Sequence, residues 1–309
     1  MKKNEKVIIL SGGFSEESEI SKITSLAIAK ALSNRQYNVQ LLDPADFSSY
    51  SDLVNAIKKI DPLIVFNGLH GAEGEDGRIQ SLLSLEKILF TGSDYRASAI
   101  SMDKYISGLL ASSLGIPVPK RIIIKNITEI NSIINSIKFP VVIKPNDSGS
   151  SVGISIIKKI NDVEKAIEKA FNYSDKVLME EFVAGRELTV TILGGKPLPV
   201  VEIKPNDGWY DYTNKYTKGN TSYEVPAKIT EEETKEIQEK ALQIYKLFGC
   251  KVYARVDFRF EESKFHFLEV NTLPGMTLLS LTPMAAKEEG YDFEELLEKI
   301  IKLSLKKEF

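Results

Sequence analysis

The 309-residue sequence predicts an α/β protein whose C-terminal half is of the α+β type. Residues 1–92 alternate short apolar runs with helical segments, which is the pattern of βαβ units around a parallel sheet. Residues 252–271 contain two runs of alternating apolar and polar residues around the polar stretch 262–264, which is typical of an antiparallel hairpin. A content of 43% hydrophobic and 27% charged residues is that of an ordinary globular protein.

Composition and charge exclude several classes of protein. The net charge of −3 leaves no basic footprint for nucleic acid, and no stretch approaches the roughly 18 apolar residues of a membrane span. The apolar run 7–10 is too short for the core of a signal peptide. The single cysteine, Cys250, fits a reducing cytosol and is expected to be a small buried residue. We therefore expect a cytoplasmic protein without nucleic-acid or membrane partners.

The first 92 residues are expected to form strands at 7–10, 39–42, 63–66 and 88–90, with helices at 15–33, 52–59 and 77–85. In a parallel sheet the loops that follow the strands share one edge, and ligands bind at that edge. Two of these loops, residues 11–18 and 67–77, are rich in glycine and in carboxylates. Ser15 and Glu17 in the first loop can alternatively be interpreted as capping groups at a helix N-terminus.

Residues 93–115 are expected to form one helix that ends at Gly115, and the proline-rich stretch 116–119 is expected to lead into a second domain. Strands follow at 141–144 and 154–157. Between these strands, residues 145–153 contain two glycines and three serines, so that backbone N–H groups can surround an anion beside Lys144. The alternative is a flexible connection between two strands.

The rest of the chain continues with strands and two long helices. An apolar strand at 176–182 becomes acidic at its end, and residues 186–193 and 198–203 indicate a hairpin. The segment 208–219 combines aromatic residues, glycine and lysine, which favours a loop that closes over a ligand. Helices are expected at 230–248 and 293–306, before and after the hairpin at 252–271.

The hairpin at 252–271 carries the most informative chemical pattern. If Glu261 pairs with Phe265, the antiparallel register places Asp257 directly opposite Glu269. Two opposed carboxylates lie about 5 Å apart and repel each other unless a cation lies between them. Carboxylate and amide oxygens suit Mg²⁺, which completes its shell with water and phosphates. The pattern therefore predicts a nucleotide–metal site.

The same register places Arg255 opposite Asn271, on the face that carries the acids. The alternative interpretation is a solvated face on which Arg255 or Arg259 neutralises the carboxylates. A one-residue slip would move one strand's side chains to the other face. His266 alternates with apolar residues and is expected to face the core.

Eight motifs, in this order and at this spacing, resemble those of the D-alanine–D-alanine ligase family of the ATP-grasp superfamily. The resemblance implies an ATP-grasp fold that follows an N-terminal parallel α/β domain. The expected division is an N-terminal substrate domain at 1–92, a central ATP-grasp subdomain at 93–183, and a C-terminal ATP-grasp subdomain with the loop 208–219 and the metal site at 184–309. The motifs are GGFSEESEIS, LHGAEGEDG, SMDK, KPNDSGSSVG, EEFVAGRELTV, YDYTNKY, ARVDF and LEVNTLPGMTLLSLTPMAA.

The resemblance implies that ATP lies between the central and C-terminal domains. Lysines contact its phosphates, the backbone of 180–183 borders the adenine, and Glu187 contacts the ribose. It also implies two Mg²⁺ or Mn²⁺ ions at Asp257, Glu269 and Asn271, where the hairpin pattern independently predicts a metal. The expected ATP-binding residues are Lys104, Lys144, Ser150, Ser151, Glu180, Glu181, Phe182, Val183, Glu187 and Lys215.

By the same resemblance, Glu17 anchors the amino group of the first D-alanine and forms a hydrogen-bonded trio with Ser150 and Tyr216. Arg255 and Ser280 hold the carboxylate of the second substrate, and an N–H group at Gly275 faces the developing oxyanion. The expected catalytic residues are Glu17, Ser150, Tyr216, Arg255 and Ser280. The expected substrate-binding residues are Glu17, His70, Arg255, Gly275, Ser280 and Leu281.

The implied activity is ligation of two D-alanines through a D-alanyl phosphate, with ATP as co-substrate, for peptidoglycan precursors. A homodimer is expected from the family. The alternatives are a D-alanine–D-lactate ligase, another ATP-grasp carboxylate–amine ligase, and a nucleotide-binding regulatory protein that has lost catalysis. Tyr216 favours the amine substrate, because ester-forming relatives alter this loop. Glu181 stands where some members carry lysine or glutamine, which matters only if the side chain contacts adenine.

Overall fold

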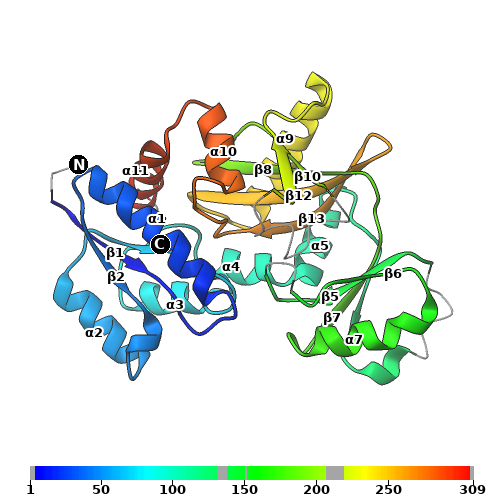
Figure 1. Ribbon diagram of the computed structural model, residues 1–309, viewed down its shortest axis with the longest axis horizontal. Coiled ribbons are helices and arrows are strands. Elements are labelled where there is room, and N and C mark those ends of the chain that lie inside the picture. The colour runs from blue at the N-terminus through cyan, green and yellow to red at the C-terminus, as the bar shows by residue number, and fades with distance from the viewer. Residues whose placement is uncertain (1–3, 131–137, 150–151, 207–218, 307–309) are drawn as a thin grey trace.

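The computed structural model describes residues 4–130, 138–149, 152–206 and 219–306, and in these ranges the chain forms three sheets flanked by helices (Figure 1). The N-terminal sheet lies on the left of Figure 1, a second sheet with its helix lies on the right, and the largest sheet lies above them. Within the described ranges, no helix has both the length and the apolar character needed to cross a bilayer.

The N-terminal sheet is parallel, as the alternation of strands and helices predicts. Its central strand β1 contributes Val7 and Ile9 to one buried cluster and Ile8 and Leu10 to another, which explains a continuous apolar run. The predicted strand at 88–90 is reduced to a parallel bridge from Phe90. The sheet order is β2-β1-β3, and the elements are β1 (Lys6–Leu10), α1 (Ser18–Asn34), β2 (Asn38–Leu42), α2 (Tyr50–Ile60), β3 (Ile64–Asn67) and α3 (Arg78–Leu85).

The prediction of one helix over 93–115 is wrong, because the chain forms two helices there, α4 (Tyr95–Met102) and α5 (Lys104–Ser113). Asp103 separates them with an extended backbone, and its side chain accepts a hydrogen bond from the N–H group of Ile106. This is an N-cap contact, which begins a new helix rather than continuing the old one. The break places Lys104 at the first position of α5.

The second sheet is antiparallel in all its pairs and has its own core. Apolar residues of its strands pack with one face of α7 in a separate buried cluster. The strand order is β4-β7-β5-β6. The elements are β4 (Arg121–Ile124), β5 (Val141–Pro145), β6 (Ser155–Ile157), α7 (Val163–Phe171) and β7 (Val177–Glu181). Short 3₁₀ turns lie in this part of the chain at Ile127–Glu129 and Ile160–Asp162, and in the N-terminal part at Pro44–Asp46.

The largest sheet is also antiparallel and follows the order β11-β10-β8-β12-β13, with β9 paired to β8. Cys250 is buried in the cluster between this sheet and α9, as predicted. α9 begins with a capping box in which Thr230 and Glu233 satisfy each other's backbone N–H groups. The elements are β8 (Arg186–Leu193), β9 (Lys196–Pro197), β10 (Val201–Pro205), β11 (Thr221–Glu224), α9 (Glu231–Leu247), β12 (Tyr253–Glu261), β13 (Lys264–Asn271), α10 (Leu281–Glu288) and α11 (Phe293–Ser304).

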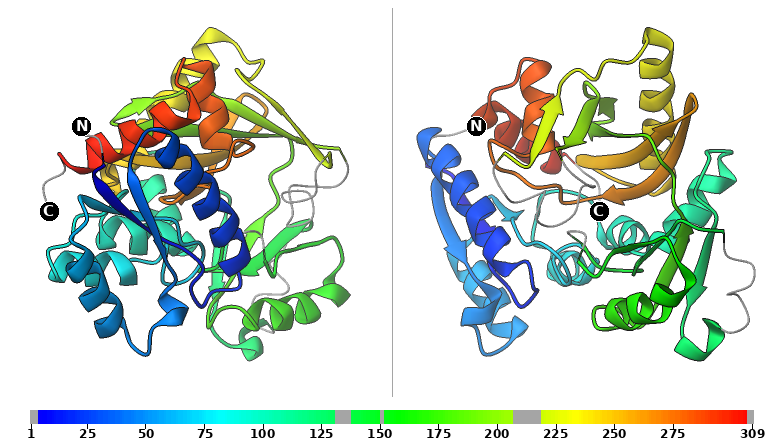
Figure 2. Two further views of the ribbon diagram at one scale, coloured as in Figure 1. Left: turned by 60° about the vertical axis from the view of Figure 1, so that its left-hand side comes forward. Right: turned by 45° about the vertical axis from the view of Figure 1, so that its right-hand side comes forward.

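The two ends of the chain share one core. Residues of α1 and of α11 belong to the same buried cluster, and Figures 1 and 2 show the two helices side by side. An exposed ion pair of 3.1 Å between Arg35 and Asp292 joins their ends. This packing fixes the N-terminal loops against the segment that follows the hairpin β12–β13.

Candidate active site

In the hairpin β12–β13 the two predicted acids lie opposite each other, and a β-bulge that was not predicted makes this pairing possible. Asp257 lies opposite Glu269, as predicted. Glu261, however, pairs with Lys264 and not with Phe265, so the register assumed at the turn is wrong. The register shifts by one residue beyond Asp257, which leaves Leu268 as the extra residue of a β-bulge. The bulge compensates for the one-residue error at the turn.

The bulge also changes which side chains of β13 face the core. Phe265 and Phe267 are fully buried, and Val270 is buried as well. His266 is only partly buried, so its predicted core position is wrong. The alternation of sides is interrupted at Leu268, and residues before the bulge therefore point to the opposite side from the one that a regular strand would give.

Asp257 is buried and already has partners for both oxygens. The Nε and Nη2 groups of Arg255 donate hydrogen bonds of 2.8 Å to the two oxygens of Asp257. The hydroxyl of Thr189, on β8, donates a third hydrogen bond of 2.5 Å to Oδ1. The interpretation of a solvated face is therefore wrong for Asp257, although its Arg255 pairing is present.

Glu269 has a cationic neighbour from another part of the chain. The Nζ atom of Lys104 lies 3.4 Å from Oε2 of Glu269 and donates a 2.7 Å hydrogen bond to the carbonyl of Ser148. Asn271 uses its side-chain oxygen to accept a 2.9 Å hydrogen bond from the N–H group of Leu273. The hairpin thus brings two carboxylates and one amide together beside an arginine and a lysine.

These donors fit a hard divalent cation. Asp257, Glu269 and Asn271 offer only oxygen ligands, which is what Mg²⁺ and Mn²⁺ prefer. In the described part of the chain, no group of three or more His, Cys, Asp or Glu residues forms a cluster able to hold a metal. A cation here would thus rely on two acids and an amide, with water and phosphate completing its shell.

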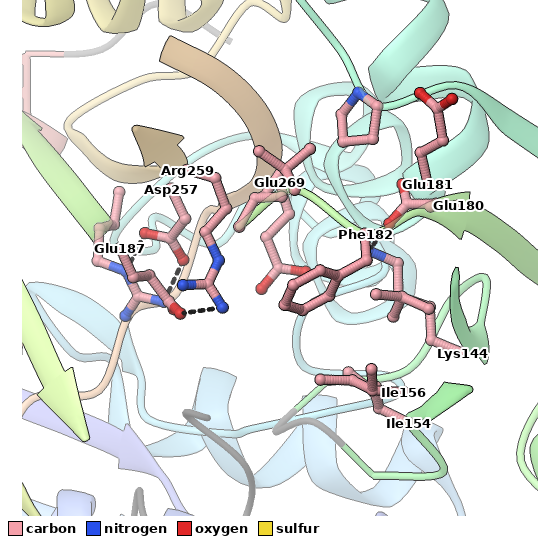
Figure 3. Close-up of a pocket in the computed structure, with 15 residues that line it drawn as sticks. Lys144, Ile154, Ile156, Glu180, Glu181, Phe182, Glu187, Asp257, Arg259 and Glu269 are labelled. Carbon is pink, nitrogen blue, oxygen red and sulfur yellow. Dashed lines mark hydrogen bonds and ion pairs between the residues drawn. The ribbon is translucent and has the colours of Figure 1, made fainter. Parts of the chain in front are cut away.

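A first cavity, of about 90 Å³, lies between the second sheet and the hairpin (Figure 3). Figure 3 shows Phe182 and Lys144 on one side of it and Asp257 and Arg259 on the other, with Glu269 between them. Apolar side chains of Ile154 and Ile156 lie below Lys144 in this view. The lining residues are Pro119, Val142, Lys144, Ile154, Ile156, Glu180, Glu181, Phe182, Val183, Glu187, Arg255, Asp257, Arg259, Leu268 and Glu269.

Glu180 is the centre of a buried charge cluster beside this cavity. Its Oε2 atom lies 2.5 Å from Nζ of Lys144, and its Oε1 atom lies 2.7 Å from Nη2 of Arg121. Burial is the largest influence on Arg121 and lowers its pKa, while the charge of Glu180 acts in the opposite direction. Glu187 is expected at the ribose, and its Oε2 atom lies 3.6 Å from Nη2 of Arg259.

A second cavity, of about 410 Å³, lies between the N-terminal loops and the hairpin. Arg255 and Glu269 line this cavity and the first one, so the two spaces meet at the hairpin. The lining residues include Glu17, Ile20, Ile23, Thr24, His70, Glu75, Ser101, Met102, Lys104, Gly149, Tyr223, Val270, Asn271, Gly275, Thr277, Leu279, Ser280 and Leu281.

Glu17 is held between two glycines at the edge of the second cavity. It is 7% exposed, and it is the N-cap residue of α1 without a side-chain capping bond. A Cβ atom added to Gly71 would lie 2.8 Å from Oε2 of Glu17, and one added to Gly149 would lie 2.7 Å from the same atom. The loop after β5 and the loop after β3 therefore meet at this carboxylate.

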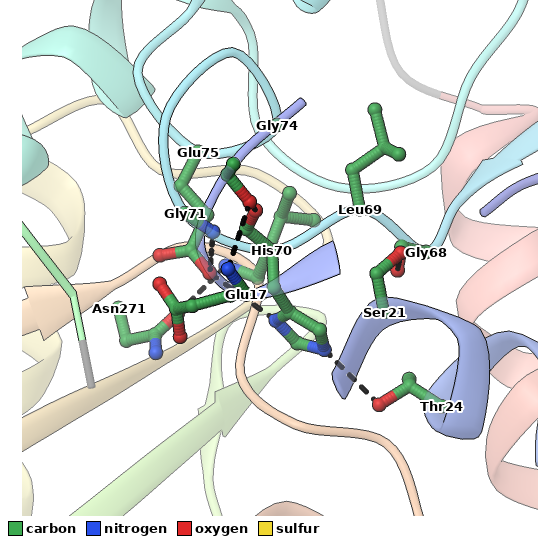
Figure 4. A network of polar contacts seen from close by, with 12 residues as sticks. Glu17, Ser21, Thr24, Gly68, Leu69, His70, Gly71, Gly74, Glu75 and Asn271 are labelled. Carbon is green, nitrogen blue, oxygen red and sulfur yellow. Dashed lines mark hydrogen bonds and ion pairs between the residues drawn. The ribbon is translucent and has the colours of Figure 1, made fainter. Parts of the chain in front are cut away.

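His70 belongs to a polar network in the same place (Figure 4). Its Nε2 atom is 3.1 Å from the hydroxyl of Thr24, and its Nδ1 atom is 3.3 Å from Oε1 of Glu75. The Ser15 hydroxyl donates a 2.6 Å hydrogen bond to the His70 carbonyl. The ring is therefore held from both sides, with its orientation fixed toward α1.

Gly275 and Ser280 lie in the loop before α10. The Ser280 hydroxyl oxygen accepts a 3.0 Å hydrogen bond from the N–H group of Thr277 and is 2.9 Å from the Thr277 hydroxyl. A Cβ atom added to Gly275 would lie 3.1 Å from this hydroxyl. The loop thus folds tightly around Ser280 at the wall of the second cavity.

The predicted site residues that the structure describes come together around the two cavities, from segments that lie far apart in the chain. Ser150, Ser151, Lys215 and Tyr216 lie outside the described residues, as does the predicted closing loop apart from its last residue. Sequence reasoning missed Thr189, Arg121 and Glu75, which contact the predicted residues. Glu75 and Thr189 stand inside two of the quoted motifs and could have been found there, whereas Arg121 lies outside all eight motifs.

Comparison with known proteins identifies the family. Residues 110–302 match the family model described as D-ala D-ala ligase C-terminus. The D-alanine–D-alanine ligase of Aquifex aeolicus is 45% identical over 96% of this chain and 99% of its own length. The corresponding ligase of Syntrophotalea carbinolica is 39% identical over 96% of this chain and 95% of its own length.

Two solved structures that resemble this chain are ligases that act on D-alanine. D-alanine–D-alanine ligase from Bacillus anthracis complexed with ATP is 31% identical, covers 98% of both chains and has a TM-score of 0.85. VanG D-Ala:D-Ser ligase from Enterococcus faecalis is 32% identical, covers 98% of this chain and 100% of its own, and has a TM-score of 0.80. These likenesses confirm the predicted ATP-grasp fold with its N-terminal α/β part. The chain therefore belongs to the D-alanine–D-alanine ligase family.

Proposed function

We propose that this protein joins two D-alanine molecules into D-alanyl-D-alanine and converts ATP into ADP and phosphate. The observation that carries the proposal is the meeting of two cavities at Arg255 and Glu269. The first cavity combines apolar walls with Lys144, which suits part of a nucleotide, such as its base beside a phosphate. The second contains Glu17 and His70, which suit a small zwitterion. A phosphoryl group at the junction would border on both ligands.

The first half-reaction activates a carboxylate, which is otherwise a poor acyl donor. A carboxylate oxygen of the first D-alanine attacks the γ-phosphorus of ATP, the bond to the bridging oxygen breaks, and ADP and D-alanyl phosphate form. Glu17 binds the ammonium group and so orients the carboxylate, while Lys104 and Lys144 offset the charge of the phosphates. When bound at the hairpin acids, Mg²⁺ or Mn²⁺ supplies further charge neutralisation.

The second half-reaction forms the amide bond. The neutral amine of the second D-alanine attacks the acyl carbon, and the tetrahedral oxyanion collapses with loss of phosphate and of one amine proton. Arg255 and the N–H group at Gly275 are placed in this proposal to stabilise the oxyanion, and Ser280 is placed to hold the substrate carboxylate. Losing one oxyanion donor typically raises the barrier by about 3 kcal/mol. Water must be excluded, because it would hydrolyse the acyl phosphate.

We also propose that the site holds two divalent ions and that boundaries at 92/93 and 183/184 separate three domains. In this proposal the reaction takes place in the cytoplasm and serves peptidoglycan synthesis. Ser150, Ser151, Lys215 and Tyr216 complete the ATP and substrate contacts. A homodimer is tested by light scattering coupled to size-exclusion chromatography, where a monomeric mass would contradict it.

The decisive experiment is product identification by mass spectrometry after incubation with ATP, Mg²⁺ and D-alanine. We expect the mass of the dipeptide and one ADP per peptide bond, and no product with L-alanine. Glu17→Gln should lower the rate by at least about a hundredfold, since the ammonium anchor is lost. Glu19→Gln is the matched control, because Glu19 lies two residues away and is exposed. Equal rates with both alanine enantiomers would contradict the proposal.

A second candidate differs only in the second substrate. The likeness to a D-Ala:D-Ser ligase makes D-serine a reasonable competitor, and D-lactate is the corresponding ester-forming substrate. Competition among D-alanine, D-serine and D-lactate in one reaction separates these functions by product ratio. We expect D-alanyl-D-alanine to dominate, and Tyr216→Phe to admit some D-lactate. A dominant D-serine or D-lactate product in the wild-type enzyme would replace our assignment.

A further inference from the structure

Arg121 is a buried arginine that no family motif includes. It stands on β4 directly opposite Glu180 of β7, and its side chain is only 5% exposed. Its Nη1 group donates a 2.6 Å hydrogen bond to the carbonyl of Lys104, at the start of α5. Its Nη2 group lies 2.7 Å from Oε1 of Glu180. The guanidinium of Arg121 therefore contacts Lys104, which is one predicted phosphate contact. It also contacts Glu180, which pairs with Lys144, the other predicted phosphate contact.

The neighbouring helix has no side chain where the guanidinium crosses it. A Cβ atom added to Gly108 of α5 would lie 2.0 Å from Nη1 and 2.5 Å from Cζ of Arg121. The side chain of Arg121 thus occupies a space that a residue larger than glycine at position 108 would fill. Its conformation is fixed by this space and by the two contacts described above.

The charges of this cluster do not balance. Arg121 and Lys144 share the carboxylate of Glu180, which is 2% exposed. The three side chains carry a net charge of +1, as two cations and one anion. Oε1 and Nη2 are close but are not aligned for a hydrogen bond, and neither completes one within the described residues. Arg121 therefore holds Glu180 chiefly through charge.

We propose that Arg121 is a positioning residue that remains as the partner of Glu180 when Lys144 turns to a nucleotide phosphate. Without it, a shift of Lys144 would leave Glu180 as a buried carboxylate without a counter-charge, which is strongly unfavourable. Arg121 thus allows Lys144 to exchange one anion for another. The inference rests on the proposed nucleotide site, and it assigns to Arg121 no contact with the substrate.

The test is binding of nucleotides in the presence of Mg²⁺, measured by isothermal titration calorimetry without turnover. Arg121→Gln should weaken ADP binding by about tenfold or more. Adenosine binding should change by less than about twofold, because adenosine has no phosphate to draw Lys144 away from Glu180. Lys120→Gln is the matched control, since Lys120 is the preceding residue, is exposed and lies 4.0 Å from Glu181. It should leave both affinities unchanged.

A double-mutant cycle establishes whether Arg121 acts through Lys144. Lys144→Gln should weaken ADP binding, and adding Arg121→Gln to it should cause little further loss. Additive losses, equal weakening of adenosine and ADP, or an unchanged ADP affinity would each overturn the inference. Wild-type protein that binds ADP but makes no dipeptide would contradict the proposed function alone.

A thermal melt identifies any variant that does not fold. If Arg121→Gln fails to fold, Arg121→Lys carries the test. Lysine keeps the charge beside Glu180 but lacks the second arm of the guanidinium, which donates to the carbonyl of Lys104. ADP binding should then fall between the wild-type value and that of Lys144→Gln. An affinity below that of Lys144→Gln would contradict the charge-based role.

Discussion

Replacing Gly149 with alanine tests whether the loop after β5 sets the position of Glu17. The added Cβ atom would lie 2.7 Å from Oε2 of Glu17 and 3.5 Å from its Cδ atom. Ordinary van der Waals contact begins at about 3.4 Å, so the carboxylate or the loop has to move by about 0.7 Å. The backbone of Gly149 is outside the left-handed region, so alanine adds no backbone strain there.

The expected loss is in catalysis and not in folding. A misplacement of about 1 Å at a reacting group can lower a rate by about a hundredfold, so a shift of the size calculated here should reduce kcat/KM for D-alanine by about 10- to 100-fold. Stability should change little, because alanine reduces the conformational entropy of the unfolded chain by about 0.4–1 kcal/mol and so offsets part of the contact strain.

The assay is dipeptide formation at varied D-alanine concentration, with ADP affinity and the melting temperature measured in parallel. ADP affinity should fall by less than kcat/KM, because the contact added at Gly149 is with Glu17 and not with Lys104 or Lys144. Gly195→Ala is the control: it adds a Cβ atom with no neighbour within 4 Å, at a positive φ of 81°. It should lower stability without affecting catalysis. Wild-type kcat/KM in Gly149→Ala would refute the reasoning, as would a similar loss in Gly195→Ala.

Three further outcomes are expected. Thr189→Val removes the hydroxyl that donates to Asp257 and should lower the free energy of unfolding in urea by about 1–3 kcal/mol, whereas an unchanged midpoint would show that Arg255 alone satisfies the acid. Asp103→Ala removes the N-cap of α5 and should cost about 1 kcal/mol by the same measurement, and no loss would exclude a capping role. Burial raises the pKa of the Cys250 thiol to about 12 from 9.0, so a thiol reagent at pH 8 should label it only after denaturation, and fast native labelling would contradict its burial. Because the folded state favours the neutral thiol, its contribution to stability is complete below pH 9.0 and declines as the pH rises toward 12.

The sequence predicted most elements of the fold, because hydrophobic periodicity reports burial directly. The strands of the N-terminal sheet and the long helix α9 are found where the pattern places them. The break at Asp103 was missed because apolar residues continue on both sides of it. A capping aspartate inside an apolar pattern is a local signal that competes with periodicity.

The sequence predicted the candidate site less completely than it predicted the fold. The opposition of Asp257 and Glu269 was correct, although the assumed turn register was wrong, because the bulge at Leu268 restores it. A bulge has no reliable signal in a single sequence, since one extra residue leaves both apolar runs intact. The partners Thr189 and Arg121 come from other strands, so only the packing of the folded chain reveals which residues they contact.

The ion pairs on the hairpin acids influence how a divalent cation could bind at the proposed metal site. Arg255 contacts both oxygens of Asp257, and Lys104 lies 3.4 Å from Glu269. An uncomplexed divalent ion would have to displace a guanidinium and an ammonium from these acids. A polyanion that arrives together with its metal supplies replacement partners for both cations. For the metal site proposed at these acids, free magnesium salts alone should therefore bind poorly, and tight binding should require the complexed nucleotide.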